Sequence, residues 1–321
     1  MKEDRTVIAG RQRVLVLGGS GFVGRHVLAQ LAAAGHFAVV LTRRRARARH
    51  LLLLPTVQVV EGDPYDQATL ARLARGTTAA VNLVGVLHEH GRDTFERAHV
   101  ELPRLLAHAC RSAGVNRVLH MSALGAAGDA PSRYLRSKAE GETAIAASGL
   151  ATTIFRPSVI FGREDTFLNL FAKLARWFPV LPLAGANARF QPIYAGDVAA
   201  CFVRALVDNE TIGERYGLCG PKVYTLAELV RYVAEVSGHP RPVVALSPKL
   251  SSMQARVMEW LPGPLLTRDN LASMQVDSVC DAAFPGRFGV VPAALEVIAP
   301  AYLAPSAHHS RFDLFRAHGG R

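Results

Sequence analysis

Short apolar runs alternate along the first half of the chain with longer stretches in which apolar residues follow a helical repeat. The first run, RVLVLGG, spans Arg13 to Gly19, and the segment from Phe22 to His36 has apolar residues three and four positions apart. Runs that are apolar throughout are typical of parallel strands buried on both faces. We predict further strands over 37–42, 57–63, 79–85, 117–122 and 152–157.

This alternation predicts an α/β fold, with a Rossmann-type, doubly wound parallel sheet covered by helices on both faces. We expect a nucleotide-binding domain over residues 1–160, rejoined by residues 190–206. A smaller domain, for a substrate or a docking partner, is predicted over 161–189 and 207–321. The two domains are therefore expected to interleave along the chain.

The turn after the first predicted strand is rich in glycine. Its sequence, GGSGFVG, places Gly18, Gly21 and Gly24 three positions apart between a strand and a helix. Glycines there let the backbone turn tightly and present free N–H groups to a pyrophosphate at the helix N-terminus. We predict that this turn binds a nucleotide, with Ser20 and Phe22 among the contacts; the alternative is a purely structural turn.

The residues after the second predicted strand select the nucleotide. A carboxylate there would bind the ribose 2′-hydroxyl of NAD, but the sequence reads VVLTRRRARARH, without a nearby Asp or Glu. Arg43 and Arg44 are placed for charge-assisted contacts with a 2′-phosphate. We therefore favour NADP(H) as the cofactor, with NAD(H) as the alternative, and expect a solvated face for Arg45, Arg47 and Arg49.

Composition narrows the class of protein. Half of the 321 residues are hydrophobic, enough for a large domain with a smaller one attached. No apolar run has the length of a signal peptide or a membrane span, so we expect a soluble, cytoplasmic protein; attachment at the inner membrane face is the alternative. The net charge of +11 is concentrated in residues 43–49, and no helix-turn-helix signal favours nucleic acid.

Neither the histidines nor the cysteines of the sequence form a pattern that predicts a metal site or a disulfide framework. The sequence HEH, His88 to His90, has no carboxylate or cysteine partners at metal-ligand spacing, so we expect no metal. The four cysteines lie far apart without a C-x-x-C pair, and we expect reduced thiols at Cys110, Cys201, Cys219 and Cys280.

Several segments resemble one family of nucleotide-binding proteins. They read EGDPYD from Glu61, NLVG from Asn82, YLRSKAEGE from Tyr134, FRPSVIFGREDTFLN from Phe155, and YGLCGPKVYTLAEL from Tyr216. Together they resemble an atypical, extended short-chain dehydrogenase/reductase of the NAD(P)-dependent epimerase/dehydratase type. The resemblance is closest to the subgroup that contains the nucleotide-binding accessory subunit of respiratory complex I and its bacterial relatives.

The resemblance implies cofactor contacts outside the glycine turn. It places Asp63 beside the adenine and Pro157 beside the nicotinamide. The NLVG segment would shape the cofactor groove through Asn82, Val84 and Gly85.

Tyr134 and Lys138 are four residues apart, a spacing that puts two side chains on one face of a helix. The alternative is that this spacing has no catalytic meaning and that the two residues belong to an ordinary helix face. In the family, the tyrosine exchanges a proton with the substrate oxygen, while the lysine lowers the pKa of the phenol and holds the nicotinamide ribose. Ser122 would polarise the substrate carbonyl, or its hydroxyl bonds to backbone; Ala123 follows it where many extended members keep serine.

Two functions follow. We lean towards an NADP(H)-dependent oxidoreductase acting on a hydrophobic, quinone-like or isoprenoid substrate. The alternative is a non-catalytic, nucleotide-holding accessory subunit or redox sensor associated with the respiratory chain, with a respiratory-chain or membrane-surface partner. The apolar, proline-broken segment LARWFPVLPLAG, from Leu174, suits a lid over a hydrophobic substrate or a docking surface, but we favour a plain buried loop.

Overall fold

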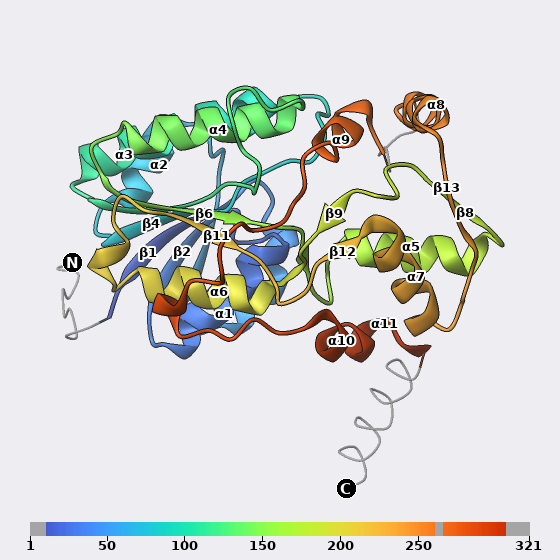
Figure 1. Cartoon of the computed structure of the whole chain (residues 1–321). Coiled ribbons are helices and arrows are strands. Elements are labelled where there is room, and N and C mark those ends of the chain that lie inside the picture. The colour runs from blue at the N-terminus through green and yellow to red at the C-terminus, as the bar shows by residue number, and fades with distance from the viewer. Residues whose placement is uncertain (1–10, 261–265, 306–321) are drawn as a thin grey trace, which may run out of the picture. The chain divides into compact units, whose positions relative to one another are not determined.

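The computed structural model of this protein describes residues 11–260 and 266–305 (Figure 1). The chain divides into two units, each of which is described by itself. Unit 1 contains the chain up to Ser122, Ser137–Phe155 and Val198–Tyr216, and unit 2 contains Ala123–Arg136, Arg156–Asp197 and the chain from Gly217 onward.

A seven-stranded sheet forms the centre of the fold, in the order β11-β6-β5-β4-β1-β2-β3. Each assigned pairing from β6 through to β3 is parallel, and Leu15 of β1 is paired with Val39 on one side and Ala80 on the other. The strands are β1 (Arg13–Leu17), β2 (Phe37–Thr42), β3 (Val57–Glu61), β4 (Ala79–Asn82), β5 (Arg117–Met121), β6 (Ala151–Pro157) and β11 (Arg215–Leu218).

The order in which successive strands are added to the sheet reverses at β1. The strands β2 and β3 extend from one edge of β1, whereas β4, β5 and β6 extend from the other. In doubly wound sheets, ligands bind at the carboxyl ends of the strands beside such a reversal. The structure therefore points to the ends of β1 and β4, where the glycine turn also lies.

Helices cover both faces of the sheet. In Figure 1, α2, α3 and α4 lie over one face and α1 and α6 over the other. Val14, Val16 and Val81 are fully buried, as expected for strands enclosed on both sides. The helices are α1 (Phe22–Ala33), 3₁₀-helical η1 (Arg45–Leu53), α2 (Gln67–Ala74), π-helical η2 (Glu96–Glu101), α3 (Leu102–Ala113), α4 (Arg133–Ala146), α6 (Ala195–Ala205) and η3 (Asn209–Thr211).

Unit 2 is built from three short strand pairs and a group of helices. The parallel pairs are β7 (Ile160–Phe161) with β10 (Ile193–Tyr194) and β8 (Leu181–Leu183) with β13 (Val243–Ala245); β9 (Arg189–Phe190) pairs antiparallel with β12 (Tyr224–Thr225). The helices are α5 (Phe167–Trp177), α7 (Leu226–Val236), α8 (Pro248–Met258), α9 (Arg268–Ser273), η4 (Gly286–Phe288), α10 (Leu295–Ile298) and α11 (Pro300–Leu303).

The helix α7 anchors this smaller unit. Thr225 and Glu228 form a capping box at its start: the side chain of each accepts a hydrogen bond from the backbone amide of the other. Its buried residues Leu226 and Val230 pack with Phe167 and Phe171 of α5. The core of unit 2 therefore lies around the contact of α5 with α7.

The predicted fold class is confirmed, and each of the six predicted strands is present. Only β2 has its predicted bounds. The strand β1 stops at Leu17 because Gly18 has φ +78°, and β3, β4 and β5 stop one to three residues before their predicted ends, whereas β6 begins one residue earlier than predicted. The predicted division of the chain at residues 160, 190 and 206, into a nucleotide-binding domain and a domain for a substrate or docking partner, stays a prediction. In the described part of the chain, no helix is both long and apolar enough to cross a membrane.

The expectation of four reduced thiols is wrong for one pair. Cys219 and Cys280, 61 positions apart, form a disulfide in unit 2, whereas Cys110 is a buried thiol. Hydrogen bonds bring the second cysteine into place, because the amide of Gln191 donates to the carbonyl of Ser278 over 3.0 Å. Sequence spacing alone carried no sign of this long-range contact.

Candidate functional site

The glycine turn is held by close backbone contacts at two of its three predicted glycines. A Cβ on Gly24 would lie 2.3 Å from the Gly18 carbonyl oxygen, and one on Gly18 would lie 2.9 Å from the Leu83 carbonyl carbon. Gly21 differs: it is exposed, and its added Cβ would meet only the Gly18 oxygen, at 3.2 Å. The fold thus requires Gly18 and Gly24, while Gly21 leaves open space for a ligand.

The N-terminus of α1 fits an anionic group. Gly21 is its N-cap, no side chain caps it, and its first turn contains no acidic residue. The first amides of a helix have no partner within the helix, and the helix dipole places positive charge there. Ser20 and Phe22, both half-buried, lie on either side of the N-cap. This is the arrangement that binds a pyrophosphate.

Arg43 lies at the end of β2, as predicted, but it has a partner that the sequence did not indicate. Its guanidinium donates to both carboxylate oxygens of Asp93, over 2.6 and 3.0 Å, and this bond lowers the pKa of Asp93. Both side chains are partly exposed, so the ion pair is weak. The neighbouring Arg44 is exposed, and its guanidinium makes no hydrogen bond or ion pair with another described residue.

Asp63 follows β3 and is exposed. Its carboxylate accepts a hydrogen bond from the amide of Tyr65, over 3.0 Å, which fixes the turn. The Tyr65 ring lies 4.0 Å from the Arg97 guanidinium carbon, a cation–π contact. The second carboxylate oxygen of Asp63 accepts no hydrogen bond from another described residue.

Asn82 shapes the chain after β4. Its buried side-chain oxygen accepts from the amide of Val84 over 3.2 Å, which turns the backbone out of the sheet. Because the oxygen is occupied by an obligate donor, the side-chain nitrogen faces Nδ1 of His120, 3.2 Å away. Asn82 therefore links the predicted cofactor loop to β5.

Gly85, at the end of the same loop, leaves room for a cation. A Cβ there would lie 3.0 Å from Nζ of Lys138 and 3.6 Å from Nε2 of His99. Any larger side chain would displace the ammonium. The loop 82–85 and Lys138 thus meet at one place in unit 1.

Lys138 is nearly fully buried, with 3% of its surface exposed. Its Nζ donates to the carbonyl of Met121 over 3.3 Å, and burial lowers its pKa to about 8, while the charge of Glu142 opposes this shift. The ammonium is therefore still mainly protonated at neutral pH. A buried cation at the end of β5 suits contact with a ligand's hydroxyl groups.

A buried histidine supports this loop, and sequence reasoning missed it. His99, in the π-helical turn η2, accepts from the amide of Val86 through Nε2 over 3.0 Å, so its Nδ1 carries the proton and faces the Ser137 hydroxyl at 2.8 Å. Burial and the charge of Lys138 lower the pKa of His99 to about 2. The only sequence signal was a polar residue inside an apolar helical repeat.

Ser122 follows β5 directly, and its amide donates to the carbonyl of Phe155 over 2.7 Å. The side chain is 3% exposed, and its hydroxyl oxygen makes no hydrogen bond with any described residue. The alternative that this hydroxyl bonds to backbone is therefore not observed. A buried hydroxyl without a partner costs free energy, unless a ligand supplies one.

Tyr134 belongs to unit 2 and lies in the first turn of α4, the helix that continues into unit 1 after Arg136. Its amide donates to Asp269 over 3.1 Å, and its ring packs with Ala123, Ala130 and Leu135. Burial raises the pKa of its phenol to about 12. Desolvation of the phenolate is the cause of this shift, and the lowering of the phenol's pKa that the family resemblance implies stays a prediction for the site with its cofactor.

Pro157, the other predicted residue in unit 2, is the last residue of β6 and is buried. Its carbonyl accepts from the amide of Leu124 over 3.0 Å. Pro157 is thus fixed by backbone pairing. Its predicted place beside the nicotinamide stays a prediction.

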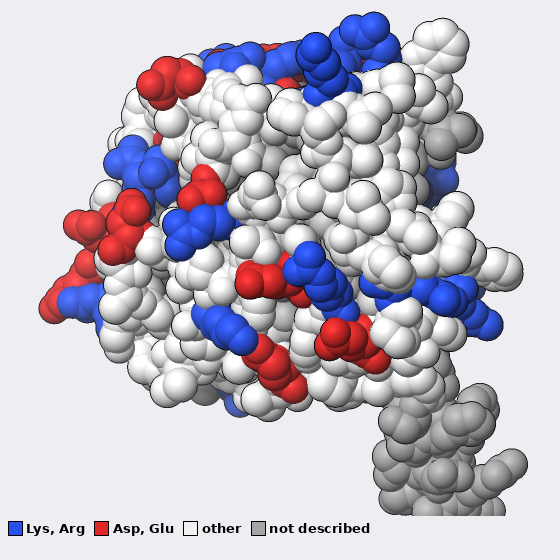
Figure 2. All heavy atoms as spheres, turned by 45° about the vertical axis from the view of Figure 1, so that its right-hand side comes forward, with Lys and Arg blue, Asp and Glu red and all other residues white. Residues whose placement is uncertain are grey.

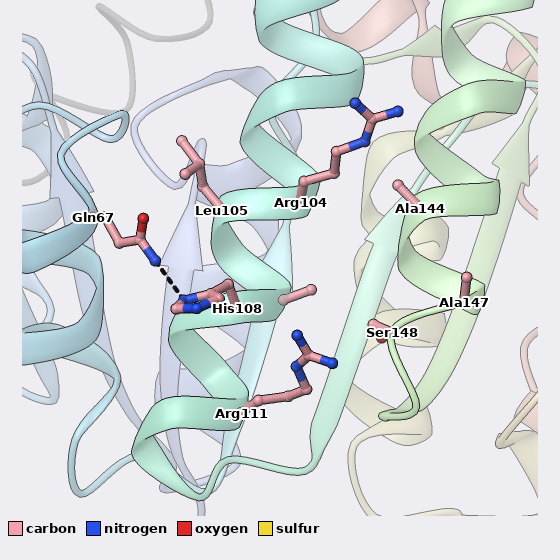
Figure 3. A pocket seen from close by; sticks show the side chains of 9 residues that line it. Gln67, Arg104, Leu105, His108, Arg111, Ala144, Ala147 and Ser148 are labelled. Atoms are coloured by element: carbon pink, nitrogen blue, oxygen red, sulfur yellow. Dashed lines mark hydrogen bonds between the residues drawn. The ribbon is translucent and has the colours of Figure 1, made fainter.

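A hollow of about 450 Å³ lies elsewhere in unit 1, on the outer side of α3 and α4 (Figure 3). Arg104, His108 and Arg111 line it from α3, and Gln67 contacts His108 across its edge. None of the predicted site residues lines this hollow, and Gln67, Arg104, His108 and Arg111, which line it, are exposed. We therefore do not assign the nucleotide to it. In the described residues, no group of three or more His, Cys, Asp or Glu side chains is arranged to hold a metal.

Comparison with known proteins gives the family of this site. A model of the NAD dependent epimerase/dehydratase family matches residues 14–219. Over 291 residues the chain is 33% identical to the mitochondrial NADH dehydrogenase (ubiquinone) 1 alpha subcomplex subunit 9 of Mus musculus, covering 88% of this chain and 77% of that protein.

Two further similarities involve reductases by name. The chain is 33% identical over 256 residues to a ceramide reductase of Caulobacter vibrioides, covering 77% of this chain and 78% of the reductase. The solved structure of an NADPH-dependent quinone oxidoreductase of Escherichia coli, complexed with NADPH, is similar in fold. That match has a TM-score of 0.73 at 20% identity and covers 90% of this chain and 99% of the other.

Proposed function

Because this chain belongs to the NAD-dependent epimerase/dehydratase family, we propose that it is an NADP(H)-dependent oxidoreductase that reduces a carbonyl group of a hydrophobic substrate. The observation that carries this proposal is the buried Ser122 hydroxyl, which has no hydrogen-bond partner among the described residues. The hydroxyls of Thr56 and Tyr232 are also buried without a partner, so the proposal uses the position of Ser122, directly after β5, together with the missing partner. A substrate carbonyl oxygen would accept its hydrogen bond.

The residues proposed for the cofactor site lie in unit 1, with the exception of Pro157. The amides at the glycine turn bind the pyrophosphate, with Ser20 and Phe22 flanking them, and Lys138 holds the nicotinamide ribose through its buried ammonium. Asp63 contacts the adenine through the carboxylate oxygen that the turn leaves unused. The loop formed by Asn82, Val84 and Gly85 shapes the groove, and Pro157 lies beside the nicotinamide.

The NADP(H) preference is part of the proposal. It rests on Arg44, whose guanidinium is unengaged among the described residues, and on Arg43, whose bond with Asp93 is exposed and therefore exchangeable. A 2′-phosphate carries more charge than one carboxylate and can accept bidentate bonds from either arginine. NAD(H) is the alternative cofactor.

The proposed chemistry assigns one proton to this chain. The carbonyl carbon would receive its hydride from the nicotinamide when the cofactor is bound. Tyr134 gives its phenolic proton to the carbonyl oxygen, and Ser122 polarises the same oxygen by donating a hydrogen bond. The phenol is protonated at neutral pH, which is the state that a reduction requires, although burial raises its pKa to about 12 and so makes it a weaker acid than an exposed tyrosine.

The substrate class is inferred from the character of the relatives. A ceramide reductase and a quinone oxidoreductase are both named among them, and each name indicates an apolar molecule with a reducible group. We propose a quinone-like or isoprenoid carbonyl compound.

The second candidate function is a nucleotide-holding subunit or redox sensor that associates with the respiratory chain. It is favoured by 33% identity to the mouse NADH dehydrogenase subunit across most of both chains. Ala123, which replaces a second serine beside Ser122, also favours it. In that case the chain would bind a partner of the respiratory chain rather than turn over a substrate.

The test compares Tyr134→Phe with the parent in stopped-flow oxidation of NADPH against panels of quinones, enals and ketones. Removing the phenolic proton should slow turnover by roughly 10²- to 10⁴-fold and leave NADPH affinity nearly unchanged. Tyr194→Phe, a half-buried tyrosine of unit 2 outside the proposed site, serves as the matched control. If the parent binds NADPH but oxidises it with none of the substrates, the result supports the subunit function instead.

A further inference from the structure

Unit 2 exposes large apolar side chains that come from two segments far apart in the sequence. We call this the α5–α8 surface. The two tryptophans are its most exposed members, at 77% for Trp177 and 88% for Trp260. Its members are Trp177, Phe178, Leu250, Met253, Val257 and Trp260. The buried-loop interpretation of the segment from Leu174 is therefore wrong where Trp177 and Phe178 are concerned.

The helix α8 differs from an ordinary surface helix in which of its residues are buried. The residues it buries, Ser251 and Ala255, are small, whereas Leu250, Met253 and Val257 are exposed. Those three lie within one stripe of the helix, at spacings of three and four residues. A helix that buries its small residues and exposes its large ones leaves its apolar stripe for another partner.

The two segments share one frame within unit 2. The Gln254 side chain on α8 donates to the carbonyl of Pro182 in β8 over 3.2 Å. The Arg241 guanidinium, just before β13, donates to the carbonyl of Ala175 near the end of α5 over 2.9 Å. Because β8 and β13 are paired, α8 and the end of α5 are fixed on the same small sheet.

The charges around this surface are mostly basic, and the acidic Glu259, next to Trp260, is paired with Arg268 over 2.9 Å. Over residues 166–185 and 240–258, every charged residue is basic: Lys173, Arg176, Arg241, Lys249 and Arg256. All except Arg241 make no hydrogen bond or ion pair with another described residue. In Figure 2, which turns this side forward, blue side chains lie above and to the right of a broad uncharged area, and red and blue side chains are mixed below it.

We propose that the α5–α8 surface docks on an anionic lipid bilayer. Exposed tryptophan with aliphatic residues on one stripe, edged by lysine and arginine, is the pattern of helices that lie in the membrane interface. The unpaired cations complement lipid phosphates, whereas they repel the same surface of a second copy. This inference concerns unit 2 and does not depend on the proposed reduction, although it would bring the chain to where apolar substrates reside.

The two tryptophans make the test direct, because they are the only tryptophans in the chain. The full chain is titrated with vesicles of phosphatidylcholine containing one-third phosphatidylglycerol, and with vesicles of phosphatidylcholine alone. Tryptophan emission should shift to shorter wavelength with the anionic vesicles, and lipids brominated along the acyl chain should quench it. The protein should also sediment with the anionic vesicles, and less at high salt.

Variants separate the apolar from the electrostatic contribution. Reversing two charges, in Lys249→Glu with Arg256→Glu, should weaken binding to anionic vesicles at least 20-fold, at roughly 5-fold for each basic residue. Replacing the stripe, in Leu250→Ser with Val257→Ser, should abolish the emission shift. Val291→Ser, an exposed valine of unit 2 outside the surface, should bind like the parent.

Three outcomes would overturn the proposal. The first is unchanged emission and no sedimentation with anionic vesicles at saturating lipid. The second is equal weakening by Val291→Ser and the stripe variant. The third is self-association without lipid, measured by sedimentation velocity, that the stripe variant removes, since the surface would then join two copies. NADPH binding by the parent is measured in each case, so that loss of membrane binding is distinguished from failure of the proposed reductase.

Discussion

Cofactor choice can be tested at the ion pair between Arg43 and Asp93. For Arg43 to bind a 2′-phosphate, its two hydrogen bonds to Asp93 must be exchanged for bonds to the phosphate. The Asp93 carboxylate would otherwise lie close to the phosphate and repel it. We therefore expect Asp93→Asn to strengthen NADPH binding and Arg43→Ala to weaken it, with small effects on NADH.

The magnitudes follow from the exposure of the pair. An exposed ion pair is worth at most about 1 kcal/mol, while a hydrogen bond between charged groups contributes about 1.5–3 kcal/mol. The net gain from Arg43 is then roughly 0.5–2 kcal/mol, which corresponds to an NADPH preference of about 2- to 30-fold. Because Asp93→Asn removes the competing bond and its charge, it should raise NADPH affinity by up to about 5-fold.

The assay is titration of the chain with NADPH and NADH, followed by the fluorescence of the reduced nicotinamide. Arg49→Ala is the matched control, since Arg49 is exposed on η1 and is expected to face solvent only. Equal losses of NADPH and NADH affinity in Arg43→Ala would refute the phosphate contact. Weaker NADPH binding in Asp93→Asn would refute the competition between the carboxylate and the phosphate.

Three further predictions concern the turn, the buried histidines and the disulfide. Gly21→Val should abolish nucleotide binding in a titration while keeping the unfolding midpoint, whereas Gly24→Ala should lower the midpoint, because its Cβ would lie 2.3 Å from a backbone oxygen. Burial lowers the pKa of His99 to about 2 and that of His120 to about 3 in the folded chain. In the unfolded chain both histidines have a pKa of about 6.5, so below that pH the unfolded chain binds more protons than the folded chain. Stability should therefore fall with acidification, by up to about 4 kcal/mol between pH 7 and pH 5 in urea unfolding; a flat profile would contradict it. Cys280→Ser should cost about 2–4 kcal/mol in the same assay, and a parent whose stability is unchanged by reductant would argue against the disulfide.

The sheet could be predicted from the sequence because its central strands, such as β1 and β4, are buried on both faces and therefore apolar, whereas the edge strand β3 has no buried residue. The ends of strands were less accurate, since they depend on single contacts. The run from Ala79 was expected to reach Gly85, but Asn82 turns the chain by accepting a bond from Val84. A side chain that bonds two residues ahead leaves no mark in an apolar pattern.

Partners that lie far apart in the chain were out of reach of the sequence. Asp93 is 50 residues from Arg43, and His99 is 38 residues from Ser137. Neither position carries a motif, because the contact arises from the crossover of a parallel sheet rather than from spacing. The same holds for Cys280, which is brought into place by Gln191 and Ser278.

The protonation states of the proposed site bear on the direction of its chemistry. Burial raises the pKa of Tyr134 to about 12, so the phenol holds its proton throughout the physiological range and can donate it. Oxidation of an alcohol would need the phenolate, which this environment disfavours. Lys138, with a pKa lowered to about 8, stays mainly charged at neutral pH but loses its charge as pH rises. In the proposed reduction the protonated phenol of Tyr134 would donate to the carbonyl oxygen, and the Ser122 hydroxyl, which has no hydrogen-bond partner among the described residues, would polarise that oxygen.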